Sequence, residues 1–490
     1  MKQEQKLPRP AADRDGSVGC RGQNWMSRET TTGQFSDQRL ERRFRAVLRK
    51  LAKGIGKSIP WACQDWANTK AAYRFFSNAR VSEHKILAGH MQATRERVSA
   101  GDGPLLVVHD TTEFIYHPED TAAIGVVSKG ASRKDAEGKP VLFTTCGICL
   151  HSSLVVTREG LPLGLAAAHF WRREEFQHCH APSNKTKAYR RPIEEKESRR
   201  WLDNLRESTR RLGQPQRCVH MGDRESDIYE LFCAAQEADT HFLIRTRADR
   251  LVEGGPDTMA QAIEQTPRRG TYRVSVRDKQ GKVSRVVLEI RYQPFRLLPP
   301  RGRKRRYPAL GITVIQARER ATPRGRERID WKLVTDLPVR SRAEAIEKVQ
   351  WYTLRWRIET FHKVLKSGCH AEQAKLRTAA RLINLLAVLC ILSWRIFWLT
   401  MINRSAPEAR PDLAFTALEL RVLDASVKDP PKAGRQPRSI SRYLTKLARL
   451  GGYLARASDP PPGNMVMWRG LTSLIDIELG VMIGARLVGN

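Results

Sequence analysis

Two short apolar runs that each end in an aspartate place the strongest constraint on the fold of this chain. Residues 105–110 (Leu-Leu-Val-Val-His-Asp) and 218–223 (Cys-Val-His-Met-Gly-Asp) are unbroken and too short for typical helices. Such runs are typical of strands that are covered on both faces in an α/β sheet, where sites lie at the strands' carboxyl ends. They predict an α/β core with Asp110 and Asp223 at one edge. An aspartate after a strand is also often only a turn or cap residue.

The surrounding segments extend this core. Residues 146–156 and 163–170 are predicted strands, and residues 193–212 a predicted helix. From about 240 to 340 apolar and polar residues alternate, which predicts an inserted antiparallel β region. Its loop 301–306 has five basic residues and is either a phosphate contact, which we favour, or solvated surface.

Helical patterns flank the α/β core on both sides. In residues 37–53 apolar side chains recur at helical spacing and arginines cover the opposite face, so this helix faces either DNA or solvent. With a second helix over 61–76 it forms a helical N-terminal domain, residues 26–95, after a flexible leader, residues 1–25. A helical region punctuated by prolines, residues 401–490, ends the chain.

The charge balance indicates an anionic partner. The chain has 86 Lys and Arg against 52 Asp and Glu, a net charge of +34. Nucleic acid is the partner we expect, although an anionic membrane surface or a ribosomal role also fits such an excess. We expect a cytoplasmic, nucleoid-associated bacterial protein: the N-terminus has no apolar signal region, and nine cysteines stand without a disulfide framework. The apolar stretch 382–402 is interrupted by Asn384 and Arg395, which favours a buried helix over a membrane span.

A third acid stands on a predicted helix over residues 348–366. Leu354, Ile358, Phe361 and Leu365 form one apolar stripe. The opposite, exposed face is predicted to carry Tyr352, Arg355, Glu359, Lys363 and Lys366. Glu359 is then one acid among bases, although an ordinary solvated face with i,i+4 ion pairs would give the same pattern.

Three carboxylates in one place would indicate a metal site. Like charges at close range cannot all stay ionised, and Mg²⁺ or Mn²⁺ with its preference for oxygen ligands relieves the conflict. Two such ions can activate an attacking oxygen and stabilise the leaving oxygen of a phosphoryl displacement. Cys146 and Cys149 have zinc-like spacing, as does His178-Cys179-His180, but cysteines three apart on a strand face opposite ways, so we do not expect zinc.

Four short motifs accompany the acids. They are Tyr352-x2-Arg355-x3-Glu359-x6-Lys366, His-Asp110-Thr-Thr, Gly-Asp223-Arg-Glu-Ser-Asp-Ile-Tyr and, near the N-terminus, Tyr73-Arg-Phe-Phe. Taken together and in their order along the chain, these motifs resemble the IS-four family of bacterial DDE transposases, whose signature is YREK. The likeness is closest to its Tn-five-like members. Leu450-Gly-Gly and Trp468-Arg-Gly are similar to its C-terminal region. The likeness covers about residues 25–475 and leaves the leader aside.

The resemblance implies a ribonuclease-H-like catalytic domain over residues 96–400, with a β insertion at about 240–340, and a dimerisation domain over residues 401–490. It implies a homodimer that cleaves transposon-end double-stranded DNA through a hairpin and joins the 3′ ends to target DNA. Asp110, Asp223 and Glu359 would hold two Mg²⁺ ions, with Mn²⁺ tolerated. Arg245 would contact a phosphate, and Trp331 would hold a flipped base, although without the resemblance Trp331 is a core tryptophan.

Two other functions remain open at the level of sequence. A ribonuclease-H-like nuclease that cuts without joining would carry the same three acids, but the YREK residues and Trp331 favour strand transfer. A non-catalytic relative that only occupies DNA ends is less consistent with the presence of all three acids.

Overall fold

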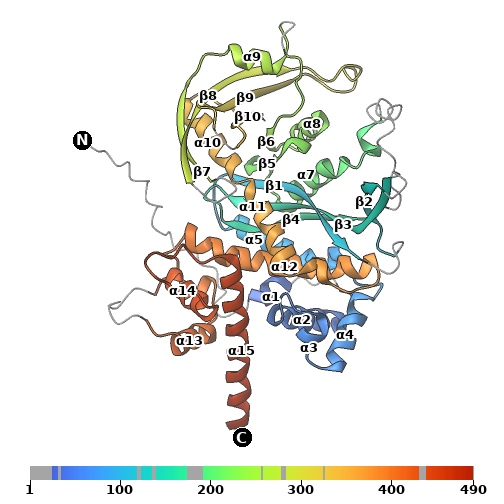
Figure 1. Cartoon of the computed structure of the whole chain (residues 1–490), viewed down its shortest axis with the longest axis vertical. Coiled ribbons are helices and arrows are strands. Elements are labelled where there is room, and N and C mark those ends of the chain that lie inside the picture. Colours follow the sequence, from blue (N-terminus) through green and yellow to red (C-terminus); the bar gives the residue numbers. More distant parts are fainter. Residues whose placement is uncertain are drawn as a thin grey trace, which may run out of the picture.

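One mixed β-sheet organises the molecule. The computed structural model describes residues 25–30, 35–117, 123–134, 140–173, 191–254, 258–277, 283–323, 326–429 and 438–488. The described strands form a ten-stranded sheet in the order β2-β3-β1-β5-β6-β10-β9-β8-β7, with β4 paired to β3 (Figure 1). They are β1 (Leu105–Tyr116), β2 (Val126–Lys134), β3 (Pro140–Thr157), β4 (Pro162–Trp171), β5 (Cys218–Gly222), β6 (His241–Arg245), β7 (Gly270–Arg277), β8 (Val283–Leu297), β9 (Leu310–Glu319) and β10 (Asp330–Thr335).

The neighbouring strands β3, β1, β5 and β6, with β4 beside β3, form the central part of this sheet. β3 runs antiparallel to both β1 and β4, whereas β1, β5 and β6 are parallel neighbours. The predicted strands 105–110 and 218–223 are confirmed as β1 and β5, and every residue of β5 is buried. This large mixed sheet is consistent with a ribonuclease-H-like core.

The β region after β6 extends the sheet instead of forming a separate layer. β7, β8, β9 and β10 are consecutive antiparallel neighbours, and β10 pairs antiparallel with β6. The alternating sequence pattern therefore predicted the antiparallel strands β7 to β10 correctly. The antiparallel region begins after β6, later than the predicted start at about residue 240. β6 falls inside the predicted range and belongs to the parallel core, because four of its five residues, His241 to Ile244, pair with β5.

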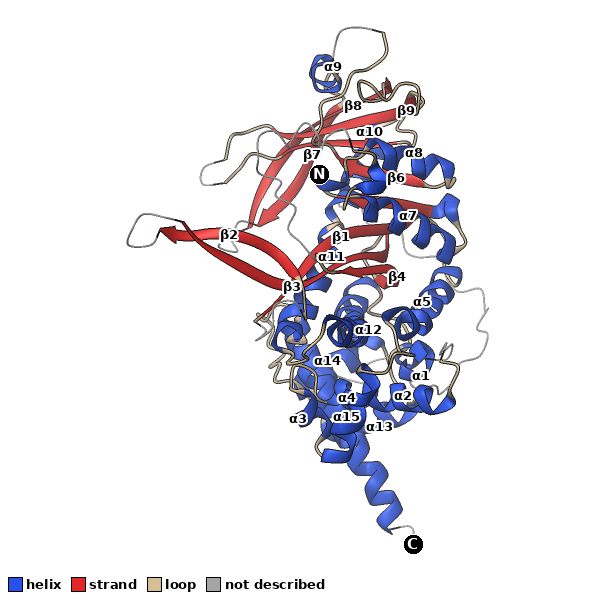
Figure 2. Cartoon of the chain, turned by 90° about the vertical axis from the view of Figure 1, so that its right-hand side faces the viewer, coloured by secondary structure: helices blue, strands red, loops and turns tan. Residues whose placement is uncertain are grey.

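Helices cover the sheet and form the opposite half of the molecule (Figures 1 and 2). The first nine labelled are α1 (Trp25–Thr30), α2 (Gln38–Lys53), α3 (Ile59–Cys63), α4 (Trp66–Phe76), α5 (Glu83–Ser99), α7 (Arg199–Leu212), α8 (Tyr229–Glu237), α9 (Met259–Gln265) and α10 (Arg342–Thr353). They are followed by α11 (Trp356–Lys363), α12 (Ala379–Ser405), α13 (Ala417–Ser426), α14 (Ile440–Leu450) and α15 (Asn464–Val488). Short helices include η1 (Ile193–Glu195), η3 (Arg224–Ser226) and the π-helical turn η4 (Val364–Gly368).

Capping residues set where the N-terminal helices α2 and α4 begin. The predicted helix over 37–53 is confirmed as α2, where the Asp37 side chain accepts from the Arg39 N–H at 2.8 Å. The predicted single helix over 61–76 is wrong. The chain breaks at Gln64, whose φ of 64° is left-handed, and the Asp65 carboxylate then caps α4 by accepting from the Asn68 N–H at 2.7 Å.

α12 is the central helix of the helical half. It has 27 residues and is long and apolar enough to cross a membrane by length and composition, contrary to the prediction from sequence, yet its most apolar stretch is wholly buried in the protein. Each of its two polar interruptions forms a hydrogen bond there, while the buried Arg395 Nε has no partner among the described residues. Asn384 Nδ2 donates to the Phe76 carbonyl at 3.2 Å, and an Arg395 guanidinium nitrogen donates to the Ala414 carbonyl at 2.6 Å. Buried helix is therefore the correct assignment.

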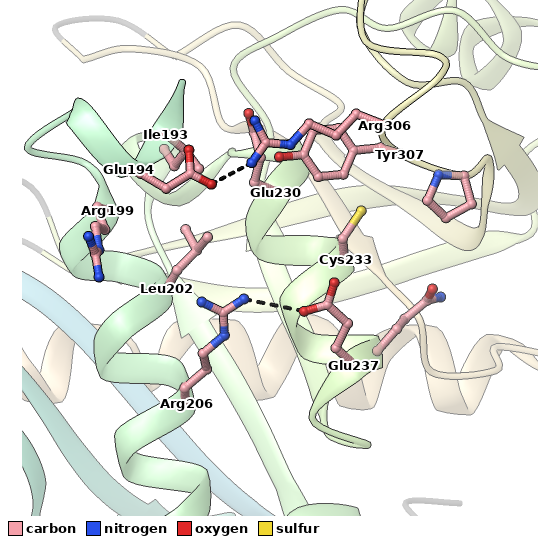
Figure 3. Close-up of a pocket in the computed structure, with 12 residues that line it drawn as sticks. Ile193, Glu194, Arg199, Leu202, Arg206, Glu230, Cys233, Glu237, Arg306 and Tyr307 are labelled. Atoms are coloured by element: carbon pink, nitrogen blue, oxygen red, sulfur yellow. Dashed lines mark hydrogen bonds and ion pairs between the residues drawn. The ribbon is translucent and has the colours of Figure 1, made fainter. Parts of the chain in front are cut away.

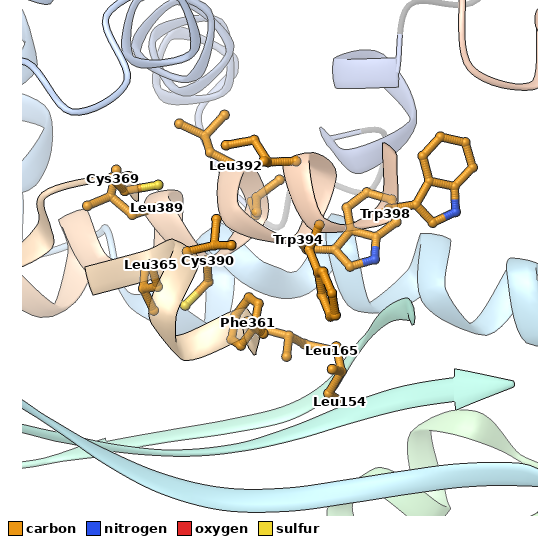
Figure 4. Packing of buried hydrophobic residues seen from close by; sticks show 14 of the residues in the cluster. Leu154, Leu165, Phe361, Leu365, Cys369, Leu389, Cys390, Leu392, Trp394 and Trp398 are labelled. Atoms are coloured by element: carbon orange, nitrogen blue, oxygen red, sulfur yellow. The ribbon is translucent and has the colours of Figure 1, made fainter. Parts of the chain in front are cut away.

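α12 holds the end of α11 against the sheet. Figure 4 shows Phe361 and Leu365 packed between α12 and the strands that carry Leu154 and Leu165. All four side chains are fully buried. Burying a side chain of this size stabilises a protein by roughly 1.5–3 kcal/mol. This packing fixes the face of α11 that approaches β1.

Candidate active site

The sheet brings Asp110 and Asp223 side by side. β1 and β5 are paired in parallel from Leu105↔Cys218 to Val108↔Met221. Continuing that register by two residues places Asp223 beside Asp110, on strands that lie about 4.8 Å apart. Asp110 is still within β1, where its Cα partner on β3 is Ser152, whereas Asp223 follows the end of β5 and caps η3 by accepting from the Glu225 N–H at 2.8 Å.

Glu359 reaches the same edge from α11. The predicted single helix over 348–366 is broken: α10 ends at Thr353, α11 begins at Trp356, and η4 widens the last turn. The apolar stripe is nevertheless correct, since Ile358 and Phe361 are fully buried. α11 packs against β1, and Glu359 is 37% exposed.

The three carboxylates act on one another electrostatically. Burial, together with the negative charges of Asp223 and Glu359, raises the pKa of Asp110 to about 7. A hydrogen bond from the Thr111 N–H and the charge of Arg355 act in the opposite direction without restoring the ordinary value. Three acids from separate parts of the sequence therefore share one local field.

The two YREK residues that precede Glu359 are buried, contrary to the prediction of an exposed face. Tyr352 is 3% and Arg355 8% exposed. A helical wheel gives only the angular position of each side chain around the helix axis. It does not show that the extension of the sheet covers this side of the helix. A terminal nitrogen of Arg355 lies 2.7 Å from a Glu359 carboxylate oxygen, an i,i+4 ion pair of the kind that the alternative interpretation, a solvated helix face, also expects. The Nε of Arg355 is buried and has no hydrogen-bond partner among the described residues.

Arg245 and Trp331 join this group from the neighbouring strands. Arg245 ends β6, and burial lowers its pKa, as do the charges of Arg224 and Arg355, while Tyr352 and Asp223 act oppositely. Trp331 on β10 is partly buried, and its ring meets the Tyr352 ring edge-on at a centroid distance of 5.4 Å. Arg245 therefore lies within the electrostatic reach of Asp223, and Trp331 lies against Tyr352.

The two predicted lysines lie further along the same helix. Lys363 is exposed near the end of α11. Lys366, in η4, has its ammonium 3.8 Å from a Glu372 carboxylate oxygen and 5.6 Å from the centre of the Phe114 ring. Glu372 also accepts from the Ile115 N–H at 2.9 Å, so Lys366 is held beside β1 beyond Asp110.

Comparison with protein families agrees with this geometry. Residues 22–81 match the family model "Transposase DNA-binding", and residues 192–394 match the model "Transposase DDE domain". The chain is a DNA-binding DDE transposase. Asp223 and Glu359 lie inside the matched DDE stretch, whereas Asp110 lies between the two matched stretches and is placed beside them by the β1–β5 register.

DDE transposases use divalent metals, and the donor types at this edge of the transposase fit them. Carboxylate oxygens are the ligands that Mg²⁺ and Mn²⁺ prefer. Among the described residues, however, no three acid, histidine or cysteine side chains are gathered closely enough to hold an ion as they stand. For Glu359 the reason is its ion pair with Arg355, which occupies the carboxylate that an ion would need.

A histidine that the sequence did not single out stands behind Asp110 in the transposase. His362 is buried, and its Nε2 is hydrogen-bonded to Ser152 Oγ at 2.9 Å while its Nδ1 lies 3.8 Å from an Asp110 carboxylate oxygen. Burial, aided by the charge of Lys366, lowers its pKa to about 3, so the ring is neutral. The available signal was its spacing of three residues from Glu359, which places both on one side of α11.

Arg200 on α7 is a second unpredicted neighbour. Its Nε donates to Thr111 Oγ1 at 3.1 Å, and another of its nitrogens lies 3.2 Å from a Glu225 carboxylate oxygen. It therefore bridges the residues next to Asp110 and Asp223. No sequence signal distinguished it from the other arginines of α7.

The loop over residues 301–306 is less free than predicted. Arg303 forms an ion pair with Glu230, and Arg306 with Glu194. Figure 3 shows Arg306 and Tyr307 at the rim of a cavity of about 380 Å³ between this loop, α7 and α8. None of the three acids lines that cavity. Two of the five basic side chains are thus tied to the protein's own acids, and Arg301, Lys304 and Arg305 are exposed.

Of the two groups of residues with zinc-like spacing, the structure describes one. Cys146 and Cys149 are buried in β3. His178, Cys179 and His180 lie outside the described residues. Asp227, the second aspartate of the Asp223 motif, has a structural role: its carboxylate accepts from the N–H groups of Arg247 and Ala248 at 2.6 Å.

Proposed function

We propose that this transposase is an IS-four family, Tn-five-like enzyme that moves DNA by cut-and-paste transposition, with Asp110, Asp223 and Glu359 as its catalytic acids. The observation that carries the proposal is the shared electrostatic field of these carboxylates, which come from two neighbouring strands and one helix. A position where burial and like charges both oppose ionisation is costly unless a cation is added, so its presence indicates function.

Asp110, Asp223 and Glu359 would together hold two Mg²⁺ ions, with Mn²⁺ as a substitute. Bound there, the ions would activate the attacking oxygen and stabilise the leaving oxygen of phosphoryl transfer. Cation binding would compete with Arg355 for the Glu359 carboxylate, because the ion pair of 2.7 Å occupies one of its oxygens. Arg355 would then be available to a DNA phosphate.

The surrounding bases support a path for the DNA backbone. Arg355 offers a buried Nε without a partner among the described residues, and Arg245 lies within the electrostatic reach of both Arg355 and Asp223. Guanidinium groups bind phosphate through paired hydrogen bonds, and the buried Tyr352 hydroxyl would add one more. Lys363 and Lys366 continue this set along α11 and η4.

Trp331 supports cleavage through a hairpin. A DNA hairpin at the cut end is relieved when one base leaves the stack, and an aromatic ring is a suitable surface for that base. Trp331 is partly exposed and braced by Tyr352, so its ring has both an open side and a fixed orientation.

The C-terminal helix supports dimerisation. The end of α15 projects beyond the rest of the protein (Figures 1 and 2). Five apolar side chains near this end are between 42% and 75% exposed: Leu479, Val481, Met482, Ile483 and Leu487. Exposed apolar side chains gathered on one segment mark an interaction surface, and a second copy of α15 would cover them.

The first step is to search the DNA on both sides of the gene for inverted terminal repeats. The test then uses purified protein and a duplex that carries such a repeat, with Mg²⁺ or Mn²⁺. We expect excision with hairpin ends and joining of the 3′ ends to target DNA. Alanine at Asp110, Asp223 or Glu359 should abolish cleavage and leave end binding nearly intact. Metal-independent cleavage, or full activity of any of the three variants, would contradict the proposal.

Trp331→Ala separates the hairpin step from the first cut. Nicking should persist while hairpin formation falls. Trp331→Phe is the matched control, because it keeps an aromatic ring against Tyr352 and should restore part of the hairpin yield. An equal loss of both steps in Trp331→Ala would indicate a folding role.

A further inference from the structure

Two exposed tryptophans flank the turn between α3 and α4. Trp61 is 50% and Trp66 76% exposed. Tryptophan is highly buried on average in folded proteins, so two exposed rings five residues apart require an explanation. The turn residues Gln64 and Asp65 between them are exposed as well. We name this surface the tryptophan patch, comprising Trp61, Trp66, Lys57, Lys70 and Arg74.

The rings are held outward by a well-defined local structure. α3 and α4 pack against each other and against α2, with Ala62, Cys63, Ala72 and Phe75 buried. Lys50 of α2 donates to the Cys63 carbonyl at 3.2 Å, which ties α3 to the basic helix. Trp61 and Trp66 contribute little to this core. Their exposure therefore follows from the fold and not from a loose end of the chain.

The charge around the rings selects the partner. The Lys57 ammonium lies 5.6 Å from the centre of the Trp61 ring. On α4, Lys70 and Arg74 follow Trp66 at intervals of four residues, and both are exposed, so a basic stripe runs along the helix from the ring. Asp65 is the acid between the two rings, and its carboxylate is engaged with the Asn68 N–H and the Asn68 Nδ2 at 2.7 and 2.6 Å.

We propose that the tryptophan patch is a contact surface for duplex DNA, in which Trp61 and Trp66 pack against sugars and base edges while Lys57, Lys70 and Arg74 bind phosphates. The patch lies within the stretch that matches the transposase DNA-binding model. An anionic membrane would also favour rings beside basic side chains, so the match to the DNA-binding model is what selects DNA, whose groove is apolar at the sugars and anionic at its borders. The proposal rests on end binding by this domain and assigns part of it to aromatic contacts.

The test compares Trp61→Ala and Trp66→Ala with Lys57→Ala and Lys70→Ala in the full-length protein. The probe is a fluorescent duplex that carries the terminal inverted repeat, titrated at several salt concentrations. Each tryptophan variant should bind roughly tenfold more weakly, because apolar contact area is lost, with an unchanged salt slope. Each lysine variant should reduce the slope of log K against log salt by about 0.9.

Three controls keep the result specific. Phenylalanine at either position should recover part of the affinity. Leu454→Ala removes an apolar side chain that is 64% exposed outside this domain, and it should bind like the wild type. The thermal midpoints of the tryptophan variants should equal that of the wild type, since the rings lie outside the core.

The failure of this inference differs from the failure of the proposed function. Tryptophan variants that bind the duplex like the wild type, while the unmodified protein binds the repeat, would overturn the tryptophan patch alone. The same holds if these variants bind DNA normally but change the oligomeric state or association with anionic vesicles. Absence of repeat binding by the unmodified protein would overturn the proposed function itself.

Discussion

Two buried groups of charged side chains in this transposase have opposite electrostatic character. In the first, Glu29 of α1 is 2% exposed and lies 2.6 Å from an Arg97 nitrogen and 2.5 Å from His90 Nδ1. Burial raises the pKa of Glu29, but the charges and hydrogen bonds of Arg97 and His90 outweigh this effect and lower it to about 2. In the second, burial and two neighbouring acids raise the pKa of Asp110 to about 7.

The difference between the groups lies in the sign of the neighbours, since both carboxylates are desolvated. Glu29 is compensated by cations of the protein itself, and it joins α1 to α5, so its role is structural. At Asp110 burial and the charges of two acids outweigh the one cation that acts on it, Arg355. A fold keeps such a site only if something outside the chain completes it, which is why uncompensated acids mark function and compensated ones mark stability.

The largest expected effect is on catalysis at Asp110. Asp110→Asn should lower cleavage of the repeat duplex at least about a hundredfold, since even groups behind a metal ligand contribute 10–100-fold. Stability without metal should not fall, because the substitution removes a charge that burial opposes. The measurements are single-turnover cleavage and urea unfolding in a chelator. If Asp110→Asn lost stability together with activity, Asp110 would have a structural role like that of Glu29. The distinction between the structural and the functional acid would then be wrong.

Glu29→Gln should show the converse behaviour. Breaking one side of a buried ion pair leaves Arg97 uncompensated and costs roughly 3 kcal/mol in the free energy of unfolding. Cleavage at a temperature where the variant is folded should be retained.

The pH dependence of this loss has a defined sign. The folded pKa of about 2 lies below the ordinary glutamate value of 4.5, so Glu29 contributes its full stability above about pH 4.5 and loses it as the pH falls towards 2. The difference in unfolding free energy between wild type and Glu29→Gln should therefore shrink over that window. A difference that does not change with pH would show that the substitution acts through packing alone.

An intermediate effect is expected from added Mg²⁺. An ion that binds only the folded state stabilises it by about 2.7 kcal/mol at a hundred times Kd. Wild type and Glu29→Gln should both be stabilised, whereas Asp110→Asn and Asp223→Asn should respond much less. Thermal unfolding with Mg²⁺ against a chelator is the measurement. Equal stabilisation of all four proteins would place the ion elsewhere.

The two groups also differ in how far they could be predicted from the sequence. Asp110 and Asp223 were singled out because each ends an apolar run, and Glu359 because an apolar stripe orients its helix. The family resemblance was needed to join the three acids in one site. The break before Trp356 and the burial of Tyr352 and Arg355 were missed, because they depend on strands that pack over the helix. Glu29, His90 and Arg97 gave no signal at all. Glu29 stands more than sixty residues from Arg97, and only the packing of α1 on α5 brings them together.

The smallest effect is expected at Glu225, an acid that stands two residues after Asp223 and is 61% exposed. Its carboxylate lies 3.2 Å from an Arg200 nitrogen, and exposed pairs of this kind contribute roughly 0.2–1 kcal/mol. Glu225→Gln should therefore change the unfolding free energy by less than about 1 kcal/mol, leave cleavage within about twofold and leave the Mg²⁺ response unchanged. The variant tests whether burial among like charges, and not closeness to the sheet edge, distinguishes Asp110 and Asp223. A loss of cleavage comparable to that of Asp110→Asn would mean that an exposed and partly compensated acid also takes part, and charge environment would no longer separate the functional acids from the rest.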